Sequence, residues 1–251
     1  MQIIHETEYE ETMKNTVEPY LSARRRELYV PGADYPFRNE NKRITGKIHM
    51  LQYLSDAPKG VVVISHGFTE SAAKYDEVAY YFLKEGYHVY IPEHCGHGRS
   101  YRLTADPFLV HIDTWRRYVR DFLKACRYIK KSSPGSALDL FAHSMGGAIG
   151  GIAAAWEPDW FHKVILSSPM IRPLTGNVPW PAATGIALEK CILGKDEEYV
   201  AGKNHMMAAV LLRQVPQHQN QDMSVTKISA QSTKNSRPGL RPMAGSGLPQ
   251  R

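Results

Sequence analysis

The sequence predicts an α/β protein with a mostly parallel central sheet. Short β-branched or apolar runs alternate with amphipathic segments, the runs at 61–64, 87–91, 138–141 and 163–166 and the segments at 71–85, 111–131 and 145–156. Strands and helices that alternate at this spacing form βαβ units with right-handed crossovers and a parallel sheet. Segments rich in Gly, His or Ser follow three of the runs, where reactive groups gather in such sheets.

Two of the predicted strands have distinct sequence patterns. Residues 47–54 alternate apolar and polar side chains, which predicts an early antiparallel strand. The β-branched run at 61–64 is typical of a strand buried on both faces.

The helices are predicted from apolar stripes. The segment at 71–85 ends at Gly86, and the longest stripe, at 111–131, has an apolar face of Ile112, Trp115, Val119, Phe122, Leu123, Cys126 and Ile129. A further helix is expected at 184–193. Residues 6–20 predict either a polar surface helix or a flexible lead-in, and Arg24, Arg25 and Arg26 predict a solvated turn.

Composition and charge restrict the class of protein. The hydrophobic fraction of 43% and charged fraction of 22% are ordinary for a globular protein, and 251 residues are enough for one large domain. Residues 202–251 hold seven Lys or Arg and one Asp, so they account for the whole net charge of +6. Because the remainder is neutral, we expect no nucleic-acid partner.

The N-terminus and the cysteines predict a cytoplasmic protein. Residues 1–20 are acidic rather than basic and apolar, which argues against a secretory signal, and no apolar run approaches the ~20 residues of a membrane span. The three cysteines, Cys95, Cys126 and Cys191, are odd in number and widely spaced, so we expect reduced thiols.

The stretch from Leu138 to Gly147, LDLFAHSMGG, is the most informative motif. A strand that turns into a helix through small-x-Ser-x-Gly holds a serine on a sharp turn with its hydroxyl outward, and Ala142 and Gly146 provide the small residues around Ser144. The alternative is that Ser144 only caps the following helix.

Residues 61–100, VVVISHGFTESAAKYDEVAYYFLKEGYHVYIPEHCGHGRS, and 138–169, LDLFAHSMGGAIGGIAAAWEPDWFHKVILSSP, are similar to the α/β-hydrolase fold. Within it, residues 45–200 most resemble the monoacylglycerol lipase and lysophospholipase L2 group of serine aminopeptidase-like hydrolases. The resemblance implies that Ser144 is the nucleophile and that the backbone N–H groups of Met145 and Phe68 form the oxyanion hole. The sequence indicates no cofactor and no metal site.

The base and the acid of a catalytic triad stay unassigned. His143 is expected to pack at the turn and His66 to brace the loop after its strand, while His94 and His97 with Cys95 match no zinc spacing. The family usually has Asp where Glu93 stands.

We divide the chain into a lead-in at 1–44, a hydrolase core at 45–169, the start of a helical cap at 170–203 and a non-homologous, disordered tail at 204–251. The candidate triad residues beyond the core, Asp196, His205, His218 and Asp222, are poor ones because none follows an apolar strand.

The change in composition near residue 204 predicts a frameshift or a premature end of the family-like sequence. Another reading frame of the genomic DNA should then restore family-like sequence from about residue 204, and its absence would contradict this. Without the last strands, we expect a marginally stable or aggregation-prone chain, which a cooperative thermal transition above about 55 °C would contradict.

The sequence is consistent with three alternative functions. The first is a serine hydrolase that cleaves carboxylic esters of single-acyl lipids, a lysophospholipid or monoacylglycerol, with an acyl channel from the cap and transient contact with a membrane surface. The second is an inactive or weakly active remnant without the triad Asp and His. The third is an esterase or peptidase of another α/β-hydrolase subgroup, because fold does not determine substrate. Acyl length, head group and oligomeric state are left open by the sequence.

Overall fold

A computed structural model describes residues 3–36, 43–44, 46–172, 177–195 and 198. The chain divides into two units, 1–215 and 216–251, and the second lies outside the described residues, as does the predicted tail at 204–251. Within the described part, no helix is both long and apolar enough to cross a membrane.

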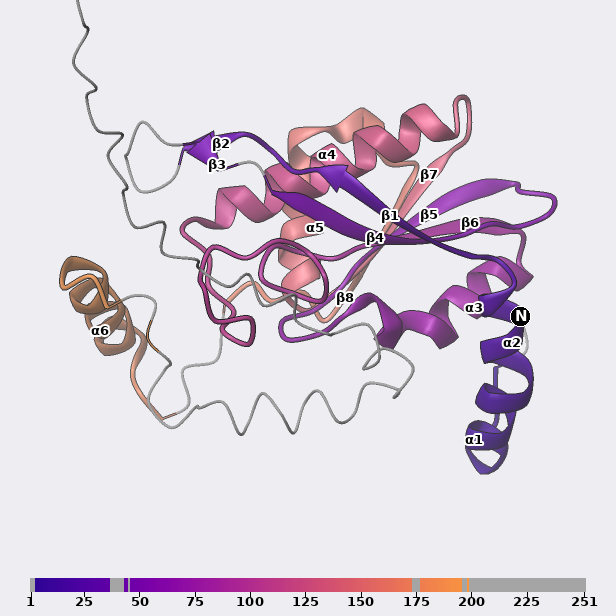
Figure 1. The fold of residues 1–251 in the computed structure, drawn as a ribbon, viewed down its shortest axis with the longest axis horizontal. Coiled ribbons are helices and arrows are strands. Elements are labelled where there is room, and N and C mark those ends of the chain that lie inside the picture. The colour runs from indigo at the N-terminus through magenta and orange to yellow at the C-terminus, as the bar shows by residue number, and fades with distance from the viewer. Residues whose placement is uncertain (1–2, 37–42, 45, 173–176, 196–197, 199–251) are drawn as a thin grey trace, which may run out of the picture. The chain divides into compact units, whose positions relative to one another are not determined.

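The centre of the fold is a six-stranded sheet in the order β1-β4-β6-β5-β7-β8 (Figure 1). The strands are β1 (Arg25–Pro31), β4 (Lys47–Tyr53), β5 (Gly60–Ser65), β6 (Tyr87–Pro92), β7 (Leu138–His143) and β8 (Lys163–Ser167). The pairs β1–β4 and β4–β6 are antiparallel, and the remaining three pairs are parallel. This confirms the mostly parallel sheet. A separate short ribbon pairs β2 (Tyr35–Pro36) with β3 (Arg43–Ile44).

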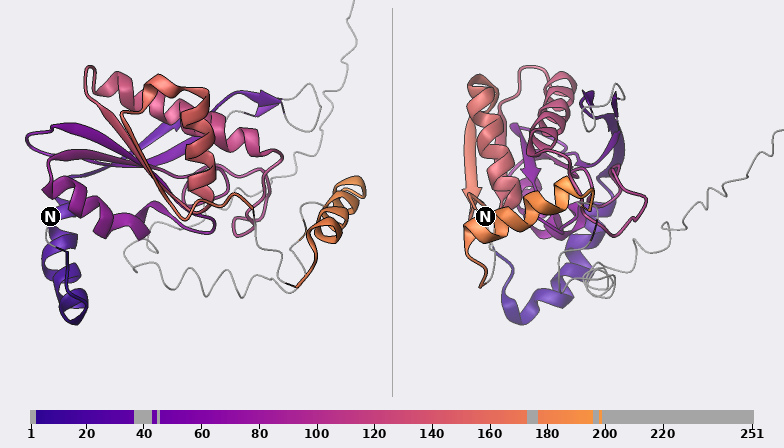
Figure 2. Two further views of the ribbon diagram at one scale, coloured as in Figure 1. Left: turned by 180° about the vertical axis from the view of Figure 1, so that it is seen from behind. Right: turned by 90° about the vertical axis from the view of Figure 1, so that its left-hand side faces the viewer.

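Helices cover both faces of this sheet (Figures 1 and 2). Helix α3 (Asp76–Lys84), which follows a 3-10 turn at Ala72–Tyr75, packs on one face, and α4 (Trp115–Ser132) and α5 (Met145–Trp156) pack on the other. Strand β5 is buried along its whole length because its side chains alternate between the two cores. Val61 and Val63 join the core under α4 and α5, whereas Val62 and Ile64 join the core under α3.

The N-terminal segment is helical rather than flexible. A 3-10 turn at Glu6–Glu8, α1 (Tyr9–Thr12), a π turn at Met13–Val17 and α2 (Glu18–Ser22) follow one another. Val17 and Leu21 are buried in the core under α3, which explains why a polar segment holds a helical structure.

Three predicted local structures are wrong. Arg25 and Arg26 are not in a turn but in β1, because the strand pairs with β4 and buries Val30 while its basic side chains stay at the edge of the sheet. The long helix begins at Trp115 rather than 111, since the Thr114 hydroxyl accepts a hydrogen bond from the Arg116 N–H and caps it there. Helix α6 (Trp180–Ile192) begins four residues before the predicted start at 184.

Candidate active site

Ser144 lies at the turn between β7 and α5 with φ 51° and ψ −120°. Its N–H donates to the Ser167 carbonyl at 3.0 Å, and its own carbonyl accepts from the Met170 N–H at 2.8 Å. These bonds tie the turn to the residues that end and follow β8. Its backbone is therefore fixed from both sides.

Positive φ angles of non-glycine residues occur in the described chain at Thr69 (57°), Ser144 (51°) and Ser168 (45°). The three positions follow β5, β7 and β8 in turn, so they lie at the carboxyl edge of the parallel strands. Strained backbone of this kind costs about 1–3 kcal/mol per residue and clusters at functional sites. The distribution marks this edge of the sheet as the candidate site.

Gly146 and Gly67 allow the turn and the loop after β5 to approach closely. A Cβ atom at Gly146 would lie 2.2 Å from the Ser65 carbonyl oxygen and 2.4 Å from that of His66. A Cβ atom at Gly67 would lie 3.2 Å from the Cβ atom of Ser144. The small residue predicted after the serine is therefore needed because α5 begins against the backbone of β5.

The two backbone amides predicted for the oxyanion hole lie on different elements. Met145 is the first residue of α5, where backbone N–H groups have no partner within the helix and the helix dipole favours negative charge. Phe68 lies in the loop after β5. Among the described residues, neither amide donates a hydrogen bond to a protein group.

Glu70 holds the first part of that loop. Its Oε2 accepts the Gly67 N–H at 2.7 Å and the Tyr75 hydroxyl at 2.6 Å, and its Oε1 pairs with the Lys74 ammonium. Burial raises the pKa of the Glu70 carboxyl, but the hydrogen bonds from Lys74, Tyr75 and Gly67 outweigh burial and hold the pKa below its usual value. Glu70 is therefore a charged anchor of the loop, a role that the sequence analysis did not assign.

Three buried histidines lie under the loop, and burial lowers the pKa of each. His66 contacts Gly67, His94 lies 3.0 Å from the Ser65 hydroxyl, and His97, with its pKa lowered to about 3, has its Nδ1 3.0 Å from the Cys95 carbonyl. The structure thus gives His66 the bracing role that was expected of it. In the described part of the chain, no cluster of His, Cys, Asp and Glu is arranged to hold a metal ion.

No imidazole among the described residues forms a hydrogen bond with the Ser144 hydroxyl. The neighbouring His143 places its Nδ1 3.2 Å from the Ser167 hydroxyl instead. The weak triad candidates Asp196, His205, His218 and Asp222 lie outside the described residues.

Glu93 is a structural carboxylate that sequence reasoning noted only as a departure. It accepts hydrogen bonds from the Ala72 and Arg99 amides and contacts the His49 ring at 2.8 Å. Burial raises its pKa, but these contacts prevail and lower the pKa to about 2. One signal was present: Gly98 follows closely, and a Cβ there would lie 2.0 Å from this carboxyl carbon.

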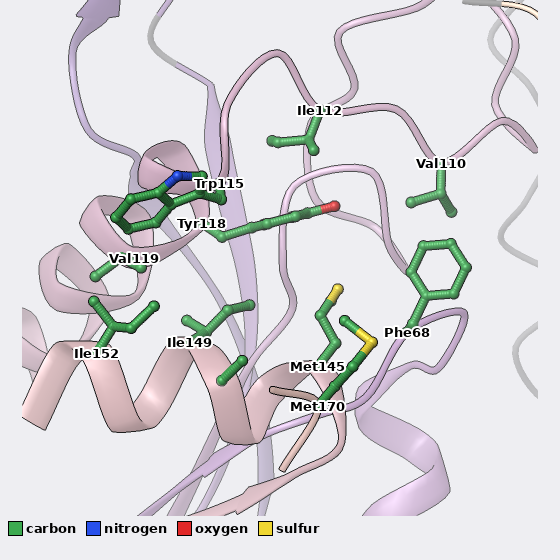
Figure 3. A pocket seen from close by; sticks show the side chains of 11 residues that line it. Phe68, Val110, Ile112, Trp115, Tyr118, Val119, Met145, Ile149, Ile152 and Met170 are labelled. Carbon is green, nitrogen blue, oxygen red and sulfur yellow. The ribbon is translucent and has the colours of Figure 1, made fainter. Parts of the chain in front are cut away.

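An apolar pocket of about 290 Å3 lies beside the turn (Figure 3). In Figure 3, Phe68, Met145 and Met170 lie toward one end, and Trp115, Val119 and Ile152 toward the other. The remaining lining residues are Val110, Ile112, Tyr118, Ala148 and Ile149. The sequence predicts an apolar channel supplied by the cap; this pocket is lined by α4, α5, the loop after β5, the segment before α4 and Met170, the first residue of the predicted cap segment.

Comparisons with known proteins agree with this fold. The alpha/beta hydrolase GrgF from Penicillium sp. sh18 superposes with a TM-score of 0.58 at 18% identity over 80% of this chain and 73% of that one. A thermostable carboxyl esterase from Bacillus coagulans superposes with a TM-score of 0.52 at 19% identity over 69% of this chain and 53% of that one. At these identities the likeness concerns the fold alone.

Sequence relatives are closer but longer. The monoglyceride lipase of Rattus norvegicus is 37% identical over 119 residues, which are 47% of this chain and 37% of the relative. Lysophospholipase L2 of Escherichia coli strain K12 is 33% identical over 144 residues, which are 56% of this chain and 42% of the relative. The chain thus spans half or less of the length of the curated relatives it matches.

The model of the family described as serine aminopeptidase, S33, matches residues 56–226. The match begins before β5, includes Ser144 and continues past residue 204, so the predicted domain boundary there stays a prediction. The match extends over more than half of the sequence and agrees with the sheet order, the strained serine turn and the fold likeness. The chain therefore belongs to the serine aminopeptidase S33 family and has the α/β-hydrolase fold.

Proposed function

We propose that Ser144 is the nucleophile of a hydrolase that cleaves carboxylic esters of single-acyl lipids, such as a lysophospholipid or a monoacylglycerol. The Ser144 oxygen attacks the ester carbonyl, and the amides of Phe68 and Met145 stabilise the oxyanion. A base takes the serine proton and returns it to the departing alcohol. Water then cleaves the acyl-enzyme and releases the fatty acid.

The observation that carries this proposal is the apolar pocket, because Phe68 and Met145 line it and Met145 directly follows Ser144. An acyl chain in this pocket would leave water, and each buried methylene favours binding by about 0.8 kcal/mol. Because a water molecule occupies about 30 Å3 in the liquid and a methylene group is of similar size, the pocket has room for on the order of ten methylenes. The pocket walls thus suit one acyl chain.

The relatives support the same substrate class. The curated names monoglyceride lipase and lysophospholipase L2 both describe enzymes for lipids with a single acyl chain. An apolar pocket next to a serine turn is the feature of this chain that such substrates require.

A second candidate is a weakly active or inactive hydrolase. It is favoured by the absence, among the described residues, of an imidazole bonded to the Ser144 hydroxyl. A nucleophilic serine needs a base within hydrogen-bond reach, and without one only the slow catalysis of the oxyanion hole is left.

Labelling with an alkyl fluorophosphonate separates these two candidates. We expect rapid labelling of the full chain that is abolished in Ser144→Ala and unchanged in the control Ser136→Ala, whose residue lies in the loop before β7. The rate should rise with pH as the base loses its proton. Labelling that is slow, independent of pH and no faster than that of Ser144→Ala would reject the first candidate and support the second.

Substrate class is tested by a chain-length series. Nitrophenyl esters should be cleaved faster as the acyl chain lengthens toward about ten carbons, the length that the pocket can hold. A preference for acetyl esters or for peptides would instead favour an esterase or peptidase of another subgroup. Liquid chromatography of the released acids or amines measures both.

A further inference from the structure

We propose that His66 is a positioning residue that fixes the direction of the Phe68 N–H and strengthens this amide as a hydrogen-bond donor. The inference rests on the proposed function, since it concerns the donor that would stabilise the oxyanion on Ser144. It assigns a specific chemical task to a buried ring that the reaction itself does not use.

One peptide unit links the His66 ring to the Phe68 N–H. The His66 Nδ1 lies 2.8 Å from the Gly67 carbonyl oxygen. That carbonyl belongs to the same planar unit as the Phe68 N–H, and in a trans peptide the two groups point in opposite directions. No peptide bond in the described chain is cis. A ring that holds the Gly67 oxygen therefore turns the Phe68 N–H away from itself.

The hydrogen bonds of the His66 ring determine its tautomer. The His94 backbone N–H donates to the His66 Nε2 at 3.0 Å, so Nε2 must hold a lone pair. Nδ1 then holds the hydrogen and donates it to the Gly67 carbonyl. Because the side chain is fully buried, its pKa is lowered and the ring stays neutral. The backbone of the loop after β6 thus sets the tautomer that the loop after β5 requires.

The same hydrogen bonds strengthen the Phe68 N–H as a donor. Hydrogen bonds in a chain polarise one another, and a carbonyl that accepts a bond makes the N–H of its own peptide unit a better donor. The chain here runs from the His94 N–H through the His66 ring to the Gly67–Phe68 peptide. On the other side, Glu70 holds the Gly67 N–H at 2.7 Å. Both peptide units that include Gly67 are therefore anchored, and the Phe68 N–H is left without an acceptor among the described residues.

The kinetic test uses two substitutions of one residue. His66→Leu removes the donor, whereas His66→Asn keeps an N–H group close to the position of Nδ1. The control is His162→Asn, which changes a histidine that is exposed and contacts Asp139 at the start of β7. Alkyl fluorophosphonate labelling of each full-length variant gives KI for binding and kinact for attack by Ser144.

We expect His66→Leu to lower kinact by at least about tenfold with KI unchanged. The loss should not exceed the ~10²–10³-fold that removal of a whole oxyanion donor costs. His66→Asn should recover part of kinact, and His162→Asn should match the wild type. A fall in kinact accompanied by an equal weakening of KI, or no advantage of Asn over Leu, would overturn the proposal, because either result indicates general damage to the fold.

A second measurement does not depend on the reactivity of Ser144. Nitrogen-15 NMR of the wild-type imidazoles reports which ring nitrogen holds hydrogen. We expect His66 to be neutral with hydrogen on Nδ1 at pH 7, and finding the Nε2–H tautomer or an imidazolium overturns the proposal. If the wild-type chain is not labelled at Ser144, the proposed function fails, and the NMR result alone decides the role of His66.

Discussion

Ser144 and Gly146, two positions apart at the turn into α5, are under opposite steric constraints. Ser144 has a side chain although its φ of 51° favours glycine, and Gly146 lacks one because a Cβ would contact the carbonyl oxygens of Ser65 and His66. A strain of about 1–3 kcal/mol at Ser144 persists only because surrounding bonds over-determine it. The Ser167 carbonyl and the Met170 N–H provide those bonds.

We predict that Gly146→Ala destabilises the protein by about 3 kcal/mol or more, since backbone atoms cannot move aside as a flexible side chain can. The matched control is Gly151→Ala in the same helix, where the nearest atom is a Leu166 methyl carbon at 3.7 Å. There, alanine should stabilise the helix by roughly 0.5–1 kcal/mol. Urea unfolding measures both, and equal effects would contradict this account of the turn.

Among the strands of the central sheet, β5 and β8 differ most in burial. All of β5 is buried between two helical layers, whereas Val164, Ile165 and Leu166 of β8 are 42%, 48% and 42% exposed. In the described sheet, β8 pairs with β7 and has no partner strand on its other side. An apolar edge strand of this kind is a template for pairing with other chains.

We predict that Ile165→Lys slows aggregation while it changes the free energy of unfolding by no more than about 0.5 kcal/mol, the usual limit for surface substitutions. The control, Ile3→Lys, adds the same charge at a residue that is 69% exposed and outside the sheet. Light scattering at fixed concentration compares their onset times. Equal protection by both variants would show that net charge, rather than the β8 edge, is responsible.

On the scale of the whole molecule, Glu93 joins parts that are distant in sequence. Its carboxylate connects β4 through His49, the turn before α3 through Ala72, and its own loop through Arg99. Its pKa is lowered from 4.5 to about 2, so the ionised form is favoured in the folded state. The ionised carboxylate therefore adds to the free energy of unfolding above about pH 4.5, and this stabilisation is lost as the pH falls toward 2.

We predict that Glu93→Gln removes on the order of 3 kcal/mol of stability at pH 7, as about 1.4 kcal/mol per pKa unit implies, and flattens the acid limb of the stability curve. Asp121 has the opposite pH dependence. Burial raises its pKa to about 6, so the folded state favours its protonated form, and the stability that this form contributes is lost as the pH rises. Urea unfolding between pH 2.5 and 7 gives the curve, with the exposed Glu11→Gln as control. An unchanged acid limb in Glu93→Gln would refute the assignment.

Most strands and helices of the core could be predicted because their signals are local. The β-branched run of β5, the stripe of α4 and the small residues around Ser144 each describe an environment that one segment requires. Strand β1 was missed for the converse reason: its Arg-rich start is polar, and only its pairing with β4 makes it a strand. The start of α4 was misplaced because an apolar stripe does not show at which residue an N-cap begins the helix.

By itself, the sequence determined the α/β layering, the order of the core elements and the serine turn, because periodicity and steric demands act between near neighbours. Only the tertiary structure decided which groups serve that turn. The bond from His66 to Gly67 depends on the His94 amide, the anchoring by Glu93 reaches Ala72 and His49, and the pocket joins Phe68 to Trp115. These contacts arise where separate strands end at one edge of the sheet, and no local pattern encodes the distances between them.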